Sequence, residues 1–298
     1  MKHLININDL TQENIYKIFD LASDIKNHKN YRNNLMGKSV ANLFFENSTR
    51  TLISFELAAK KLGADVINVN LSKSSTKKGE SLKDTILTLQ AMGINAFIVR
   101  HSDNYICEKI KGWLNDDTSL INAGDGNNQH PTQALLDCFT ILQHKNSIDD
   151  LKISIIGDIK HSRVANSLVD CLHILGNRNI NLFGPSQLLP DNTDKANICH
   201  NIESALNKAD VIVMLRIQKE RMAKHNIAEL DNYNDNFGLN REKLQMAKPD
   251  CIVMHPGPIN REVELSSDLA DNPPSVILEQ VSNGVLIRQA VLSMLITR

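Results

Sequence analysis

Residues 39–71 of the chain read SVANLFFENSTRTLISFELAAKKLGADVINVNL. The β-rich run Ser39–Phe45 predicts a strand, and the apolar stripe within Ser48–Leu62 predicts a helix that ends at Gly63. Asp65–Leu71 alternates like a second strand. A strand, a helix and another strand in this order are typical of a parallel sheet covered by helices.

The same alternation continues along all 298 residues. It predicts further strands at 96–100, 119–122, 152–156, 180–183, 210–215 and 251–254, and helices at 80–92, 105–114, 131–143, 162–175, 202–207, 242–247 and 285–296. We therefore expect an α/β fold of two doubly wound domains, each with a mainly parallel sheet flanked by helices. The polar stretch 146–150 is the predicted boundary, which gives domains 1–145 and 146–283.

Composition excludes several classes of protein. Lys and Arg number 33 against 34 Asp and Glu, so the net charge of −1 offers no broad basic face for nucleic acid or an anionic membrane. No apolar run approaches the ~20 residues that span a bilayer, and MKHLININDLTQEN lacks the apolar core of a secretory signal. Five cysteines without metal-binding spacing predict reduced, buried thiols in a cytoplasmic protein.

Polar segments follow six of the expected strands. Because ligands of doubly wound folds bind beyond the carboxyl ends of strands, these segments are the candidate sites. They are Glu46–Arg50, Arg100–His101, Gly124–His130, Gly157–Arg163, Arg216–Arg221 and His255–Arg261.

The first of these segments predicts a phosphate site. Ser48 can cap the following helix, whose first N–H groups and positive dipole end attract an anion. The hydroxyls of Ser48, Thr49 and Thr51 and the guanidinium of Arg50 add further donors. Without other information, an ordinary helix cap beside a surface arginine is an equally good interpretation.

The string FFENSTRT at Phe44–Thr51 closely resembles the phosphate-binding signature of the aspartate and ornithine carbamoyltransferases. Val99–His101 resembles that family's strand-end arginine, and GDGNNQHPTQ at Gly124–Gln133 resembles its histidine block. The resemblance implies a carbamoyl phosphate site made of Ser48, Thr49, Arg50, Thr51, Arg100, His130 and Gln133. In that site Thr51, Arg100 and His130 would stabilise the carbonyl oxygen during reaction.

Two further segments favour the aspartate-type members. Ser74–Glu80 resembles a loop whose serine and lysine enter a neighbouring subunit's site, which implies that Ser74 (or the adjacent Ser75) and Lys78 act in trans. His255–Arg261 has the aspartate-type pattern His-Pro-x-Pro, whereas ornithine enzymes typically carry His-Cys-Leu-Pro. Gly257 stands where some members have leucine.

Residues 215–221 resemble the aspartate-binding block of the second domain. Aspartate brings two carboxylates, and guanidinium groups can bind carboxylates in bidentate fashion. The resemblance implies that aspartate is bound by Lys78 in trans, Arg163, Arg216, Gln218, Pro256 and Gly257.

The resemblance also implies an active site in the interdomain cleft, with helix 284–298 packed on the first domain. The expected reaction transfers a carbamoyl group from carbamoyl phosphate to L-aspartate, without a metal or organic cofactor, in a cytoplasmic homotrimer with shared sites. The leaving phosphate would accept the amine proton. The sequence leaves open whether regulatory chains or a dihydroorotase join the trimer.

Three alternatives remain at this stage. The first is a carbamoyltransferase for ornithine or another amino acid. The second is a nucleotide-binding regulatory or oxidoreductase domain, suggested by Ile155–Asp158, although this segment lacks the G-x-G-x-x-G spacing. The third is an inactive scaffold, which the presence of every expected residue type disfavours.

Overall fold

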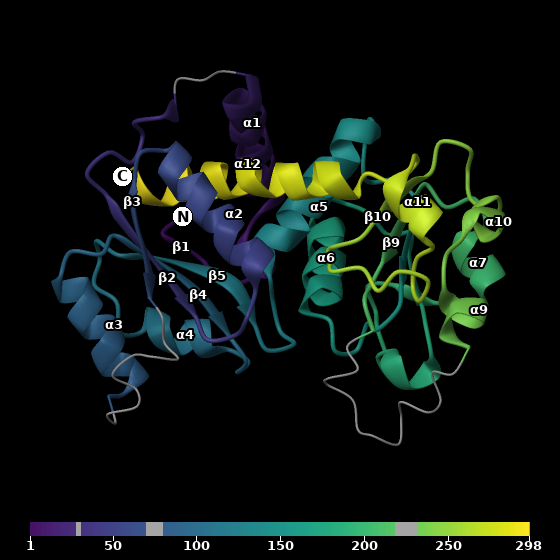
Figure 1. The fold of residues 1–298 in the computed structure, drawn as a ribbon, viewed down its shortest axis with the longest axis horizontal. Coiled ribbons are helices and arrows are strands. Elements are labelled where there is room, and N and C mark those ends of the chain that lie inside the picture. Colours follow the sequence, from purple (N-terminus) through teal and green to yellow (C-terminus); the bar gives the residue numbers. More distant parts are fainter. Residues whose placement is uncertain (28–30, 70–79, 218–231, 298) are drawn as a thin grey trace. The chain divides into compact units, whose positions relative to one another are not determined.

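The computed structural model describes residues 1–27, 31–69, 80–217 and 232–297. The chain forms two compact units, residues 1–136 with 282–298 (unit 1) and residues 137–281 (unit 2). Each unit contains a five-stranded sheet in which the neighbouring strands described are all parallel (Figure 1). The predicted fold class, two parallel sheets flanked by helices, is confirmed.

The sheet of unit 1 has the strand order β1-β5-β4-β2-β3. Its strands are β1 (His3–Leu4), β2 (Ser39–Phe44), β3 (Asp65–Val69), β4 (Ala96–His101) and β5 (Ser119–Asp125). Its helices include α1 (Gln12–Asn27), α2 (Thr49–Lys61), α3 (Leu82–Ala91) and α4 (Ile106–Lys111), with a short 3-10 turn at Ile7–Asp9. The buried residues of β2, β4 and β5 are expected in strands whose two faces are both covered, whereas the edge strand β3 has no buried residue.

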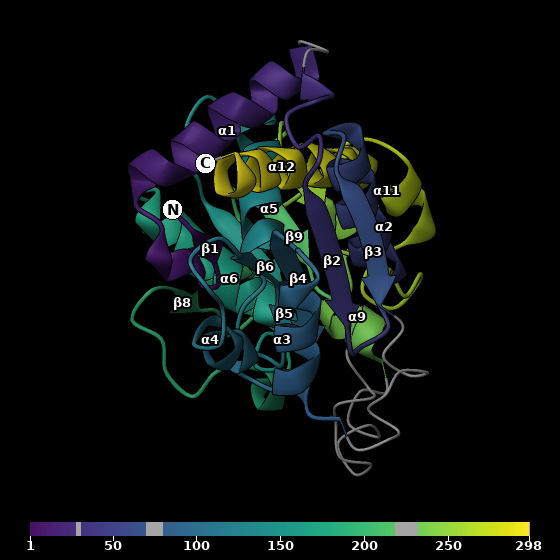
Figure 2. The same ribbon diagram turned by 90° about the vertical axis from the view of Figure 1, so that its left-hand side faces the viewer.

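Helices cover both faces of the unit 1 sheet. Phe97 and Val99 of β4 pack in one apolar cluster with Ile86 of α3 and Ile110 of α4. Figures 1 and 2 show α1 and α12 (Ile277–Ile296) on the side of this sheet away from α3 and α4. The C-terminal part of α12 is held there by the carbonyl oxygen of Leu295, which accepts a hydrogen bond from the hydroxyl of Ser119 (3.1 Å).

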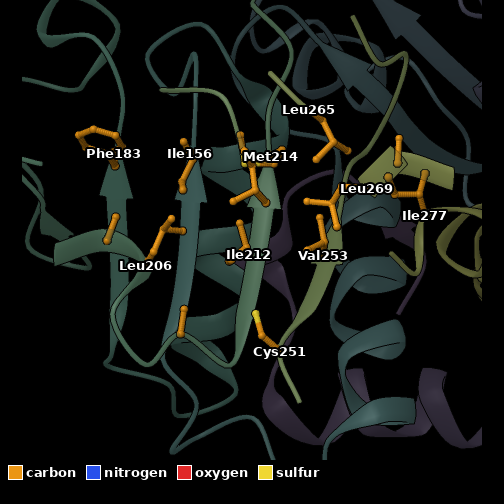
Figure 3. Packing of buried hydrophobic residues seen from close by; sticks show 14 residues of the cluster. Ile156, Phe183, Leu206, Ile212, Met214, Cys251, Val253, Leu265, Leu269 and Ile277 are labelled. Carbon is orange, nitrogen blue, oxygen red and sulfur yellow. The ribbon is translucent and has the colours of Figure 1, made fainter. Parts of the chain in front are cut away.

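The sheet of unit 2 has the order β10-β9-β6-β7-β8. Its strands are β6 (Ile153–Ile156), β7 (Ile180–Phe183), β8 (Asn197–Ile198), β9 (Val211–Met214) and β10 (Ile252–Met254). Its helices include α6 (Arg163–Ile174), α7 (Ile202–Leu206), α9 (Tyr233–Phe237), α10 (Arg241–Leu244) and α11 (Ser267–Asp271), with a 3-10 turn at Ser186–Leu188. Ile156, Met214 and Val253 project from neighbouring strands into a core shared with Leu206 of α7 and Leu269 of α11 (Figure 3).

Most predicted elements are confirmed to within a few residues, but two predictions need correction, and the described elements β1, β8, α1, α9 and α11 were not predicted. The long helix α1 was missed, although Ile15, Ile18, Phe19 and Ala22 are buried at helical spacing. Helix α12 begins at Ile277 rather than at 285 and contains Gly284, where a Cβ would lie 2.6 Å from the Arg288 guanidinium and 3.2 Å from the Leu136 side chain. Ser48 occupies the N-cap position of α2 but its side chain makes no capping hydrogen bond, so the predicted cap is wrong.

The division of the chain between the two units falls within helices rather than at the polar stretch 146–150. Helix α5 (Pro131–His144) and helix α12 each contribute residues to both units. The second half of α5 groups with unit 2 because Asp137 accepts a hydrogen bond from Gln280 (2.6 Å) and His144 lies 2.8 Å from Glu279. The structural division thus differs from the predicted domains, 1–145 with 284–298 and 146–283, because long-range bonds rather than local polarity decide it.

The cysteines mostly pack as small apolar residues, as predicted. The buried ones are Cys107, Cys138, Cys171 and Cys251, whereas Cys199 is half-buried. Burial raises the pKa of Cys107 and Cys138, and raises the pKa of Cys251 to about 12. Among the helices that the structure describes, none has the length and apolar character needed to cross a membrane.

Gly157, directly after β6, has a φ of +132°, and a Cβ there would lie 2.5 Å from the carbonyl oxygen of Leu215. Gly93 has a φ of +93° but nothing within 4 Å of such a Cβ. We expect Gly93→Ala to cost about 1–2 kcal/mol of folding free energy for its backbone conformation alone. Gly157→Ala should cost more, because it also forces apart the ends of β6 and β9. Thermal unfolding followed by circular dichroism measures the difference, and equal losses of Tm would contradict the proposed close approach.

Candidate active site

Each sheet has one switch point, a pair of neighbouring strands from which the chain connections lead to opposite sides of the sheet. In unit 1 the chain passes from β2 to β3 on one side, and from β4 to β5 on the other. In unit 2 the corresponding neighbours are β6 and β9. Ligands of open parallel sheets bind at such switch points, beyond the carboxyl ends of the two strands. The four strand ends lead into Glu46–Arg50, Arg100, Gly157–Arg163 and Arg216, which are predicted site segments.

Arg100 ties together three strand ends in unit 1. One guanidinium nitrogen donates a hydrogen bond to the carbonyl oxygen of Ala123 in β5 (3.0 Å). Its Nε lies 3.4 Å from a carboxylate oxygen of Glu46, which follows β2. Next to this pair, the ring of Phe45 packs against the imidazole of His101 at a centroid distance of 4.7 Å. The guanidinium is therefore held at the switch point by groups from both neighbouring strands.

Helix α2 begins at the same place. Ser48 is half-buried and its hydroxyl is not used to cap the helix, while Thr49 and Arg50 are exposed and Thr51 is buried. The first-turn N–H groups of a 13-residue helix carry a partial positive charge that favours an anion. The segment thus offers hydroxyls, backbone donors and a guanidinium beside Arg100, and Ser48–Thr51 and Arg100 lie at the switch point.

Asp125 shapes the turn that leads to His130. Its buried carboxylate accepts four hydrogen bonds of 2.8–3.1 Å. The donors are the side-chain amides of Asn122 and Asn128 and the backbone N–H groups of Tyr105 and Gln129. His130 follows directly, 3% exposed, and Gln133 donates its backbone N–H to the His130 carbonyl (2.9 Å). His130 therefore directly precedes α5 and Gln133 lies on its first turn, beyond the end of β5.

Unit 2 places one arginine after each strand of its switch point. Arg163 is the first residue of α6 and is buried, and the hydroxyl of Ser162 caps that helix by accepting the N–H of Ala165 (3.2 Å). Arg216 follows β9 and is half-buried. Two guanidinium groups on the segments that follow adjacent parallel strands suit a ligand that carries carboxylates.

Two buried acidic residues, Asp158 and Glu264, also belong to unit 2. Asp158, fully buried after β6, accepts the backbone N–H of His161 (3.2 Å) and lies 2.9 Å from its ring Nδ1. Burial, followed by the negative charges of Glu264 and Asp158, raises the pKa of Tyr233, so its hydroxyl stays protonated. Asp158 and Glu264 therefore lie close enough to Tyr233 for their charges to act on its hydroxyl.

A loop that begins at His255 follows β10 and leads to Glu264. Pro256 and Gly257 are both half-buried, and His255 before them is buried. Gly257 has a φ of +66°, a left-handed conformation that glycine adopts without penalty. Glycine therefore suits this position. Members of the family with leucine here would adopt this backbone only at a cost, so we expect their local backbone to differ.

Three predicted residues, Ser74, Lys78 and Gln218, lie outside the described residues. In the described part of the chain, no group of three His, Cys, Asp or Glu side chains could hold a metal ion. Sequence reasoning gave no role to Glu46, Asp158, His161, Tyr233 or Glu264. Glu46, Asp158 and His161 stand in strand-end segments and could have been considered, whereas Tyr233 belongs to α9, a helix that was not predicted.

Comparisons with known proteins agree with this geometry. Residues 2–143 match the family model of the aspartate/ornithine carbamoyltransferase carbamoyl-P binding domain, and residues 149–295 match that of the Asp/Orn binding domain. The chain is 52% identical, over 99% of its length and 96% of the relative's, to the aspartate carbamoyltransferase catalytic subunit of Coxiella burnetii.

Solved structures give the same result. The chain resembles aspartate transcarbamoylase from Trypanosoma cruzi in complex with carbamoyl phosphate and aspartate, with a TM-score of 0.85 and 31% identity over 98% of this chain and 96% of that one. The same enzyme in complex with N-(phosphonacetyl)-L-aspartic acid gives a TM-score of 0.86 and 30% identity over 98% and 95%. Ornithine carbamoyltransferase from Thermus thermophilus, at 22% identity over 99% of both chains and a TM-score of 0.87, shares the fold.

The geometry of unit 1 predicts that inorganic phosphate binds at the start of α2. A hydrogen bond to a charged group contributes about 1.5–3 kcal/mol, so Arg50→Met should weaken phosphate binding about tenfold to a hundredfold. Arg32→Met is the matched control, because Arg32 is also an exposed arginine of unit 1 but lies away from the strand ends. Isothermal titration calorimetry measures both affinities, and equal affinities in the two variants would refute the phosphate site.

Proposed function

The chain belongs to the aspartate/ornithine carbamoyltransferase family, and we propose that it transfers the carbamoyl group of carbamoyl phosphate to the amino group of L-aspartate. The products are N-carbamoyl-L-aspartate and phosphate, and the reaction is the committed step of de novo pyrimidine biosynthesis. The proposed form is a cytoplasmic homotrimer.

One observation carries the choice of aspartate over ornithine. The switch point of unit 2 presents two arginines, Arg163 and Arg216, from adjacent strands. Aspartate has two carboxylates for these guanidinium groups, whereas the side-chain ammonium of ornithine would be repelled by a second cation. Position 256 is also proline rather than the cysteine typical of ornithine enzymes. The 52% identical relative from Coxiella burnetii is an aspartate carbamoyltransferase catalytic subunit, which supports the same choice.

The proposal assigns carbamoyl phosphate to unit 1. Ser48, Thr49, Arg50 and Arg100 would hold the phosphate, and Gln133 would contact the carbamoyl nitrogen. The aspartate amine attacks the carbonyl carbon, and the developing charge on its oxygen is stabilised by Thr51, Arg100 and His130. The bond from carbon to the phosphate oxygen then breaks, and the leaving phosphate takes the amine proton. Each oxyanion donor of this kind contributes about 10²–10³ in rate.

The proposal assigns aspartate to unit 2. Arg163, Arg216 and Gln218 would bind its carboxylates, and the backbone carbonyls of Pro256 and Gly257 would accept hydrogen bonds from its amine. Gln218 lies outside the described residues, so the support for it is its place directly after Arg216 and Ile217 in the aspartate-type block.

A product assay tests the proposal. With carbamoyl phosphate and L-aspartate, the purified protein should form N-carbamoyl-L-aspartate, and N-(phosphonacetyl)-L-aspartate should inhibit it at concentrations far below the KM for aspartate, because it joins both substrates in one molecule. With ornithine in place of aspartate, no citrulline should form. Citrulline as the main product would overturn the assignment in favour of the ornithine alternative.

The surface of unit 1 supports a self-association proposal. Strand β3 is the edge of its sheet, and Ile67 on this strand is 42% exposed. On the adjacent helix α2, Ile53 and Leu57 are 48% and 44% exposed. An edge strand with apolar neighbours is normally covered. Lys78 follows soon after β3, which ends at Val69, so a copy packed on this edge would bring the predicted trans residues toward a neighbouring site.

Mixing inactive variants tests the shared site. Lys78→Ala and Arg50→Ala chains should each be inactive alone, whereas hybrids should contain sites with one intact Arg50 and one intact Lys78. Random reassembly of equal amounts into a ring should restore about a quarter of wild-type activity. Each variant carried alone through the same dissociation and reassembly is the control. Hybrids of confirmed trimeric mass without activity would rule out the trans role of Lys78.

A further inference from the structure

We propose that Glu264 and His255 are positioning residues that set the backbone of the loop Pro256–Gly257 for the amine of the incoming aspartate. This inference rests on the proposed function. It concerns two buried side chains to which neither the sequence reasoning nor the substrate assignment gave a role.

The imidazole of His255 holds the loop from inside. Its Nδ1 accepts the backbone N–H of Gly257 (2.8 Å), so the ring proton is on Nε2. Nε2 in turn lies 3.2 Å from the carboxylate oxygen Oε1 of Glu264. The two hydrogen bonds fix the tautomer and the orientation of the ring, and through Nδ1 they fix the direction of the peptide between Pro256 and Gly257.

The same oxygen of Glu264 holds the other end of the loop. Oε1 also accepts the backbone N–H of Asn260, at 2.6 Å. One fully buried carboxylate thus anchors the chain on both sides of Gly257 and Pro258, directly at Asn260 and through His255 at Gly257. All the anchored loop groups are N–H donors, so the anchoring does not use the carbonyl oxygens of Pro256 and Gly257.

The anchor continues into the unit 2 portions of two helices. The backbone N–H of His255 donates to the side-chain oxygen of Gln280 (3.1 Å), and the amide nitrogen of Gln280 donates to Asp137 (2.6 Å). Asp137 and Gln280 are buried as well. The loop is therefore connected by a continuous chain of hydrogen bonds to α5 and α12.

This arrangement matters for the proposed reaction because carbonyl oxygens accept an amine hydrogen bond only in a defined direction. The anchor acts directly on Gly257, whose backbone is left-handed and whose N–H donates to His255. A misplacement of about 1 Å can reduce a rate about 10²-fold when a nucleophile must be oriented. A buried carboxylate is expensive to desolvate, and this one is stabilised by the N–H donors it orders.

The test compares three variants in the full-length enzyme. Glu264→Ala removes the acceptor and should lower kcat/KM for aspartate about 10- to 100-fold. Glu264→Gln keeps an oxygen that can accept both donors and should restore most of that loss. Phosphate affinity, measured by calorimetry, should be unchanged in both, because the phosphate residues belong to unit 1.

Asp210→Ala is the matched control. Asp210 is also a buried carboxylate of unit 2, and it accepts the N–H of Lys152 (2.9 Å) and pairs with Lys248 (2.7 Å). It precedes β9 and so lies at the end of the sheet opposite to the strand exits. This variant should lose stability without losing kcat/KM for aspartate. Equal kinetic losses in Asp210→Ala and Glu264→Ala would show a merely structural role and overturn the proposal.

A second pair keeps the inference testable if Glu264→Ala does not fold. His255→Asn places an amide oxygen near the position of Nδ1, whereas His255→Gln replaces only the contact to Glu264. We expect the asparagine variant to keep more of the aspartate kcat/KM than the glutamine variant, with equal phosphate affinity. The opposite order, or equal losses, would refute the role of the Gly257 hydrogen bond. Wild-type protein that forms no carbamoyl aspartate would instead refute the proposed function itself.

Discussion

Parallel pairing of the strands is the constraint on which the site residues depend. Because the neighbouring strands described run in the same direction in each sheet, their carboxyl ends share one edge, and the polar segments that follow them are gathered there. Each sheet has one switch point, between β2 and β4 in unit 1 and between β6 and β9 in unit 2. Arg100 and Arg163 follow or end strands at these points, and the first turns of α2 and α6 begin there. The switch points thus select Glu46–Arg50, Arg100, Gly157–Arg163 and Arg216, whereas the family motifs at Gly124–Gln133 and His255–Arg261 follow β5 and β10, outside the switch points.

Buried carboxylates then shape the loops at those edges. Asp125, Asp158 and Glu264 each accept a backbone N–H from a residue within four positions along the chain, and each is at most 1% exposed. A carboxylate can accept several hydrogen bonds at once, so a single side chain can define a turn that has no regular secondary structure. The residues that contact substrate in the proposal are thereby separated from the residues that determine where the loops lie.

Local pattern was enough to predict the strands and the site segments, and contacts between distant residues account for what was missed. The strand ends at Arg100 and Arg216 follow from apolar runs that stop at a polar residue, which is visible in the sequence. Glu264 could not be recognised in that way, because its importance comes from His255 and Asn260, and these become its partners only in the folded loop. The division of α5 between the units likewise depends on Asp137 and Gln280, which are 143 positions apart in the chain. Ser48 shows the opposite error, since a residue type common at helix caps does not cap α2.

The membership of residues 282–298 in unit 1 has a consequence for synthesis of the chain. Unit 2 is one continuous segment, 137–281, whereas unit 1 combines residues 1–136 with residues 282–298, which are made after all of unit 2. The bond between Ser119 and Leu295 joins residues 176 positions apart, so it forms only after the whole of unit 2 has been synthesised. Domains generally fold as units while the chain emerges from the ribosome, from the N-terminus onward. Here that order is reversed for the final step, and the unit that is synthesised first is the one completed last.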